Sequence, residues 1–214
     1  MEQLLKSLTN NFEGQEVARQ MLWNKTPKYG NDDDYADTLL KASSDAFYDE
    51  LNGRKNTRGG FYYPNYLSTT CHVYFGSVVG ATPDGRRAWE PVSEGISPVQ
   101  GADTHGPTAV IKSASKIDQM RTGGTLLNQK FSPSLMEGET GIDGLAHLIR
   151  SYFKLDGHHI QLNVVTVETL RSAQANPEKY RDLIVRVAGY SDYFCDLGKS
   201  LQDEIIARTE HKVF

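Results

Sequence analysis

The hexapeptide Arg186-Val187-Ala188-Gly189-Tyr190-Ser191 contains Gly189, 25 residues before the C-terminus, and the interpretation of this chain depends on it. Residues 184–188 read as a short strand that leads into Gly189. A glycine after a strand is commonly a turn or bulge, because glycine reaches backbone conformations closed to other residues. Glycine can also hold an unpaired electron on its α-carbon, since its nitrogen donates into that centre, its carbonyl withdraws, and no side chain prevents planarity. The hexapeptide alone is compatible with both roles.

Upstream of this segment, the first 53 residues read as helical. Apolar residues at helical spacing predict two short helices before Pro27 and a longer one that ends near Leu51. Asn31 is the expected N-cap of the long helix, and Asn52-Gly53 closes it. The aspartates at 32–34 favour the start of that helix over a metal site, because consecutive helical side chains point in different directions.

The remaining segments alternate between the two periodicities, which predicts an α/β fold. We expect a turn at 82–85 and an ordered irregular segment at 89–106. The expected strands are a buried one at 70–79 and two others at 125–130 and 158–165, and the expected helices lie at 107–117, 142–155, 166–175 and from Ser200, where Ser200 and Asp203 resemble a capping box.

The clearest alternating strand is 158–165, and its two faces differ in polarity. One face carries Ile160, Leu162 and Val164, and the other carries His159, Gln161 and Asn163. A polar face of this kind can line a solvated surface or the lumen of a barrel. We interpret His158 and His159 as a hydrogen-bonded pair at the strand end, because no cysteine or acidic residue lies at ligand spacing. No metal site is predicted.

Composition excludes several classes of protein. The net charge is -4 and the basic residues are scattered, so neither a nucleic-acid partner nor a membrane partner is expected. No apolar run approaches the length of a membrane span, and the N-terminus lacks the pattern of a signal peptide. Cys71 and Cys195 suggest neither a disulfide framework nor a zinc site, and each is expected to behave as a small buried hydrophobe. A cytoplasmic location follows as the expectation.

Several blocks of the sequence, in the same order, closely resemble those of glycyl radical enzymes, within the dehydratase and lyase branch. Their number makes the resemblance far more specific than one motif. Besides the hexapeptide, they are Lys28-Tyr29-Gly30-Asn31-Asp32-Asp33-Asp34-Tyr35, Arg58-Gly59-Gly60, residues 79–88 (VGATPDGRRA), residues 97–103 (SPVQGAD), residues 126–133 (LLNQKFSP) and residues 201–210 (LQDEIIARTE).

The resemblance implies a fold, namely a ten-stranded barrel of two five-stranded halves wrapped by helices. Family members are several times longer, so this chain is expected to be their C-terminal segment. Residues 1–118 would then be the last portion of the barrel domain, and residues 119–214 the glycine radical domain. His159, Gln161 and Asn163 would face the lumen.

The resemblance also implies that Gly189 is the catalytic radical site. No cofactor would be bound, and a separate radical S-adenosylmethionine activase with an iron-sulfur cluster would install the radical. Arg186, Val187, Ala188, Tyr190 and Ser191 would form the radical loop, with Ser191 able to bond its backbone. Arg186 could instead be a surface charge, and Tyr190 could be a packing residue.

The expected activity is elimination of water from trans-4-hydroxy-L-proline, with glycerol or choline as alternative substrates. The family's thiyl cysteine lies upstream in a Gly-Cys-x-Glu type loop that neither cysteine here fits, so the isolated chain is expected to be inactive. The expected partners are the activase, the missing N-terminal portion, a small-molecule substrate and a second copy in a homodimer of the whole enzyme. A spare-part subunit that repairs an oxygen-cleaved enzyme and an inactive gene remnant are the other interpretations.

Overall fold

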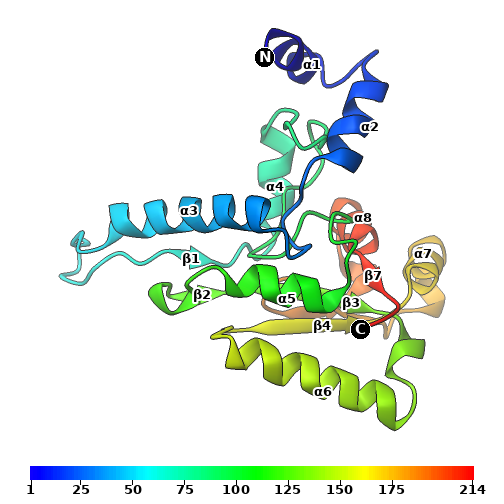
Figure 1. Cartoon of the computed structure of the whole chain (residues 1–214). Helices are drawn as coiled ribbons and strands as arrows, with labels where there is room; N and C mark the ends of the chain where they lie inside the picture. The colour runs from blue at the N-terminus through cyan, green and yellow to red at the C-terminus, as the bar shows by residue number, and fades with distance from the viewer.

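A three-stranded parallel sheet forms the centre of the molecule, and the computed structural model describes all residues, 1–214. Its strands run in the order β4-β3-β7. The strands are β1 (Asn65–Tyr66), β2 (Gly124–Thr125), β3 (Leu127–Phe131), β4 (Ile160–Val164), β5 (Ile184–Arg186), β6 (Ser191–Tyr193) and β7 (Glu210–His211). The helices are α1 (Glu2–Thr9), α2 (Glu16–Lys25), α3 (Asp34–Leu51), α4 (Cys71–Val78), α5 (Pro107–Ser115), α6 (Gly138–Lys154), α7 (Val167–Ala175) and α8 (Lys199–Ala207) (Figure 1).

The mixture of helices with parallel strands confirms the α/β prediction. Two further sheets have two strands each, a parallel pair β1-β2 and an antiparallel hairpin β5-β6. The largest sheet thus has three strands, and the ten-stranded barrel stays a prediction for the whole protein. No helix of the structure has the length and apolar character needed to cross a membrane.

The middle strand β3 is buried on both faces, and the two faces meet different partners. Leu127 and Phe131 belong to an apolar core with residues of α5 and α6. Successive side chains of a strand point to opposite faces, so Asn128 and Lys130 point the other way. There Asn128 bonds to the carbonyl of Val187, just after β5, and Lys130 bonds to the last turn of α8. The sheet therefore separates an apolar layer from a polar one.

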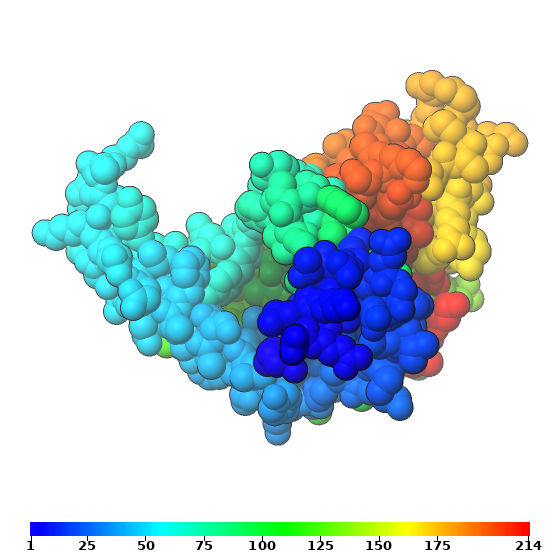
Figure 2. Space-filling view, turned by 90° about the horizontal axis from the view of Figure 1, so that it is seen from above, coloured from blue at the N-terminus to red at the C-terminus, as the bar shows by residue number.

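Away from the sheet, α3 and residues 52–66 form an arm that projects from the body of the molecule (Figures 1 and 2). In the view of Figure 2 the surface is hollowed between this arm and the rest of the chain. A cavity of about 430 Å³ lies at the base of the arm, with Tyr29, Leu40, Phe47 and Ile96 among its lining residues.

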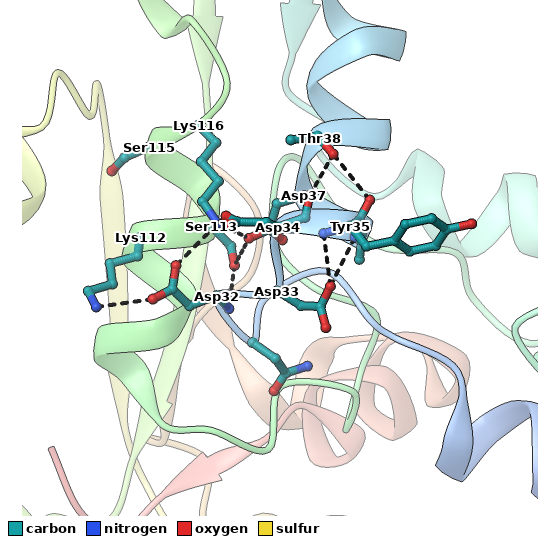
Figure 3. Close-up of polar contacts among 12 residues, drawn as sticks. Asp32, Asp33, Asp34, Tyr35, Asp37, Thr38, Lys112, Ser113, Ser115 and Lys116 are labelled. Atoms are coloured by element: carbon teal, nitrogen blue, oxygen red, sulfur yellow. Dashed lines mark hydrogen bonds and ion pairs between the residues drawn. The ribbon is translucent and has the colours of Figure 1, made fainter.

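Acidic residues at the start of α3 join this helix to α5, and Figure 3 shows their contacts. The N-cap is Asp33, whose side chain accepts hydrogen bonds from the amides of Tyr35 and Ala36, so the prediction of Asn31 as N-cap was wrong. The reason is that the side chain of Asn31 is taken by Ala102, Thr104 and His105. The interpretation of the triplet as a helix start is confirmed.

The largest error of the sequence analysis concerns residues 70–79, which form helix α4 and not a buried strand. A short apolar run cannot be assigned to strand or helix by periodicity alone. The helix places Gly76 against the backbone of Glu90, where an added Cβ would lie 2.2 Å from the carbonyl oxygen. It also leaves Cys71 exposed, which contradicts the prediction of a buried thiol.

Helix boundaries were predicted with mixed success. Pro107 opens α5 as expected, and the side chain of Thr166 caps α7 by accepting the amide of Thr169. The capping box at Ser200 was wrong, because α8 begins at Lys199 after an N-cap at Gly198 that has no side-chain bond. Ser200 therefore already lies inside the helix.

Candidate functional site at the glycine loop

The hairpin β5-β6 carries the hexapeptide at its tip, which we call the glycine loop (residues 186–191). Arg186 pairs with Ser191 across the hairpin, and the amide of Val187 donates to the carbonyl of Tyr190 at 2.8 Å. Ala188 and Gly189 are therefore the two central residues of a tight turn, and Gly189 has a φ of +92°. Residues with a side chain rarely adopt that conformation, so the turn requires glycine at this position.

Amide side chains from the polar layer of the sheet hold this loop by its backbone. Asn163 forms two bonds with Arg186, accepting from its N–H and donating to its C=O, both at 2.8 Å. Gln161 accepts the N–H of Gly189 at 3.2 Å, and Asn128 donates to the carbonyl of Val187 at 3.1 Å. All three amides are buried. They satisfy backbone groups that would otherwise lose their hydrogen bonds on burial.

Apolar packing fixes the other side of the loop. Val187 and Ala188 are buried in a core with residues of α7 and α8, and Tyr190 packs against the same core. Gly189 itself is exposed. A Cβ added at Gly189 would lie 3.4 Å from Leu126 Cδ1, which is ordinary contact. The position thus requires glycine for its backbone angle and not for lack of space.

The remaining candidate residues lie around the loop in different ways. Arg186 is half-buried and its guanidinium donates to the hydroxyl of Ser191 at 2.8 Å. His159 is half-buried with no partner for Nδ1, and burial together with the charge of Arg186 lowers the pKa of His159. Gln161 and Asn163 on β4 therefore bond to the loop, whereas His159, which immediately precedes the strand, does not.

A buried polar cluster behind the loop was missed by the sequence analysis. Arg208 forms two bonds with Glu204, at 2.9 and 2.8 Å, and donates to the carbonyl of Arg186 at 3.4 Å. Nε2 of His72 lies 3.3 Å from Glu204, and Glu94 is buried beside them. Glu204 and Arg208 are four residues apart, a spacing typical of a helical ion pair, and this was the one available signal.

The ionisable groups of the cluster have strongly shifted pKa values. Burial favours the neutral form of Glu204, but the charge of Arg208 outweighs it and holds the pKa of Glu204 at about 2. For Glu94 burial prevails and raises the pKa to about 7. Burial also lowers the pKa of Lys130 to about 8. Such shifts are common at functional sites.

Neither cysteine forms a hydrogen bond with the glycine loop. Cys195 Sγ donates to the carbonyl of Tyr180 at 3.3 Å, and burial followed by the charge of Asp196 raises the pKa of its thiol. Cys195 is partly buried against the core, as expected of a packing residue. Cys71 begins α4 and is exposed.

Two family models match separate parts of this chain. A family described as "Glycine radical" matches residues 92–195, and one described as "Pyruvate formate lyase-like" matches residues 1–76. Trans-4-hydroxy-L-proline dehydratase of Clostridioides difficile is 58% identical over 210 residues, which cover 98% of this chain and 27% of that protein.

Solved structures also match almost the whole of this chain. Hydroxyproline dehydratase from Clostridioides difficile, with trans-4-hydroxy-L-proline bound, matches with a TM-score of 0.96 and 57% identity over 99% of this chain. Glycerol-bound glycerol dehydratase from Clostridium butyricum matches with a TM-score of 0.94 and 48% identity, also over 99%. In each case the match covers 27% of the relative, so the chain spans about a quarter of their length.

Proposed function

Because this chain belongs to the glycyl radical enzymes, we propose that Gly189 is the residue that carries the radical. The observation that supports this proposal most directly is the geometry of the turn at Gly189. Gly189 is exposed, adopts a φ of +92°, and is held through its N–H by a buried amide. An α-carbon without a side chain can become planar, and an exposed one can be reached by another protein.

The proposed chemistry begins outside this chain. A separate radical S-adenosylmethionine activase removes one hydrogen atom, proton and electron together, from the α-carbon of Gly189. We propose that the whole enzyme is longer at the N-terminus, contains the ten-stranded barrel and forms a homodimer. In that enzyme the glycyl radical takes a hydrogen atom from a cysteine of the N-terminal portion. That cysteine then acts on the substrate. His159, Gln161 and Asn163 would lie on the lumen side of the barrel.

For the substrate we propose trans-4-hydroxy-L-proline, from which the whole enzyme eliminates water. The support is the 58% identity to a protein with that activity in its name. Glycerol is the second candidate, because the glycerol dehydratase structure superposes almost as well. The free cysteines Cys71 and Cys195 fit a reducing compartment, and we propose a cytoplasmic location.

The radical site is tested by replacing two glycines. Gly189→Ala should abolish the electron paramagnetic resonance doublet after anaerobic activation, and Gly198→Ala should keep it. Gly198 is a matched control, because its φ is -61° and no atom lies within 4 Å of an added Cβ. On exposure to air the unmodified chain should be cut beside Gly189, and mass spectrometry should find a large fragment ending near Ala188. A doublet in Gly189→Ala, while a full-length relative is activated in parallel, would refute the assignment.

A further inference from the structure

The guanidinium of Arg208 joins the end of α8 to the glycine loop, and the proposed chemistry does not use it. Its Nε and Nη2 donate to the two carboxyl oxygens of Glu204, at 2.9 and 2.8 Å. The remaining nitrogen, Nη1, donates to the carbonyl of Arg186 at 3.4 Å. Both residues of the ion pair are buried, Glu204 at 2% exposed and Arg208 at 8%. A single planar group therefore binds an acid on one side and the loop on the other.

The stability of the fold does not by itself explain a buried ion pair at this place. Removing two charges from water carries a large cost, and apolar residues of similar volume often stabilise a protein as well or better. An arginine pairs with a carboxylate through a fork of fixed geometry, so the direction of its third nitrogen is fixed as well. The pair therefore aims one donor at one backbone group, which apolar residues could not do.

Glu204 is itself held by neighbours from other elements. Its Oε1 also accepts from Nε2 of Gln100 at 2.9 Å, and Nε2 of His72 on α4 lies 3.3 Å from its Oε2. The backbone amide of Arg208, the C-cap of α8, donates to the carbonyl of Glu204 at 3.2 Å. Lys130 of β3 donates to two carbonyls in the last turn of the same helix. These bonds fix the guanidinium relative to the central sheet independently of the loop.

The carbonyl of Arg186 is bonded by two donors when the loop is docked. Asn163 of β4 donates to it at 2.8 Å, and Arg208 donates to it at 3.4 Å. A carbonyl oxygen has two lone pairs, so the two donors together satisfy it. The bond from Arg208 to the loop is longer than its two bonds to Glu204, which are also charge-assisted on both sides. The bond to the loop therefore breaks first when the loop leaves, and the guanidinium stays on the acid.

We propose that Arg208 is a positioning residue for the glycine loop, held by Glu204 as a fixed donor to the carbonyl of Arg186. The importance of this contact for the reaction rests on the proposed role of Gly189, but the contact itself does not. Arg208 remains in place while the loop is away and presents the same N–H when the loop returns. Lysine cannot replace it, because an ammonium lacks the planar fork that serves the carboxylate and the loop at fixed angles.

The test is Arg208→Lys in the complete 214-residue chain. Hydrogen exchange is followed at the amides of Arg186 and Gly189, which bond to side chains of β4 and therefore report docking of the loop. Their protection should fall about tenfold more than that of the amides of α6, because the loop loses a bond from a charged donor. The ¹³C resonance of the Arg186 carbonyl should move upfield, as expected when a carbonyl loses a donor.

The matched control is Arg181→Lys. Arg181 pairs with Glu178 through the same two nitrogens, Nε and Nη2, at 2.9 and 2.7 Å. Its side chain is 73% exposed, and it forms no hydrogen bond with the glycine loop. This variant should leave the protection of the loop amides and the carbonyl resonance of Arg186 unchanged.

A second measurement keeps the proposal testable if Arg208→Lys does not fold. In unmodified chain labelled with ¹⁵N at arginine, the Nη1 protons of Arg208 should show nuclear Overhauser cross-peaks to backbone protons next to the Arg186 carbonyl. Absence of these cross-peaks overturns the proposal. So does a folded Arg208→Lys variant in which the loop and α6 lose protection equally, or in which the Arg186 carbonyl resonance does not move. Neither experiment needs a radical, so failure here is separate from failure of the Gly189 assignment.

Discussion

At the scale of the residue, Asn163 is the position with the strictest requirement for the chemistry of its side chain. It forms two bonds with the two backbone groups of Arg186 and is 4% exposed. A carboxylate of the same size keeps the acceptor but loses the donor, and it places a charge beside a carbonyl oxygen. The loop therefore depends on an amide at this position and not merely on a polar side chain.

We expect Asn163→Asp to reduce the free energy of opening of the glycine loop by about 1–3 kcal/mol. Hydrogen exchange at the amides of Arg186 and Gly189 measures this change directly. The control is Asn176→Asp, since Asn176 is exposed and bonds only within its own helix end. That variant should shift exchange by less than about 0.5 kcal/mol. Equal effects in the two variants would show that Asn163 does not hold the loop.

At the scale of the element, a sequence pattern predicted the structure correctly where that pattern had one physical explanation. The alternation of β4 correctly predicted a polar face with Gln161 and Asn163, since a period of two leaves no helical alternative. Prediction from the pattern failed at residues 70–79, where every position but His72 and a few small residues is apolar and no period can be read. The hydrogen bonds from the polar face to the hairpin could not be predicted from the sequence, because they join residues more than 20 positions apart.

The same limit applies to the junction of α3 and α5, which sequence spacing does not indicate. Asp37 is 1% exposed, accepts from the hydroxyl of Ser113 at 2.8 Å, and lies 2.8 Å from Lys116 (Figure 3). Lys116 also pairs with Asp32 and Asp34. These contacts attach the projecting arm to the body of the molecule.

We expect Asp37→Asn to destabilise the chain by about 1–3 kcal/mol, because it removes a charge from a buried pair and leaves the ammonium of Lys116 with weaker partners. Asp34→Asn is the matched control on the same lysine. The Asp34 side chain is 90% exposed, so its loss should cost less than about 1 kcal/mol. Urea denaturation of the two variants gives both values. The junction is not stabilising if Asp37→Asn unfolds at the same urea concentration as the unmodified chain.

At the scale of the whole molecule, a large part of the apolar surface is uncovered. Tyr74 and Val78 of α4 are 64% and 63% exposed, and Leu39, Phe47 and Phe61 along the arm are about half-exposed. Large apolar side chains left exposed along α4 and along the arm are candidates for an interface with another chain or segment. The exposed side chains of residues 70–79 lie on helix α4, whereas the sequence predicted a strand there.

We therefore expect the isolated chain to associate with itself or to bind a hydrophobic dye. Light scattering gives the mass, and fluorescence of the dye gives the exposed surface. Tyr74→Ser combined with Val78→Ser should reduce both signals, while Met120→Ser, which removes a residue that is 69% exposed but lies outside α4 and the arm, should leave them nearly unchanged. A monomer that binds no dye would show that this surface is not an interface.

The amide bonds beneath the glycine loop have one more consequence, which concerns its return after any departure. The hairpin β5-β6 is separate from the central sheet and bonds to it through side chains, so its removal breaks no backbone ladder. Asn163 matches both backbone groups of a single residue, and a hairpin shifted by one position would present the wrong groups to Gln161 and Asn128 as well. The hairpin can therefore re-dock in one alignment only, and a hairpin that is out of register makes fewer of these bonds, so it can dissociate and dock again.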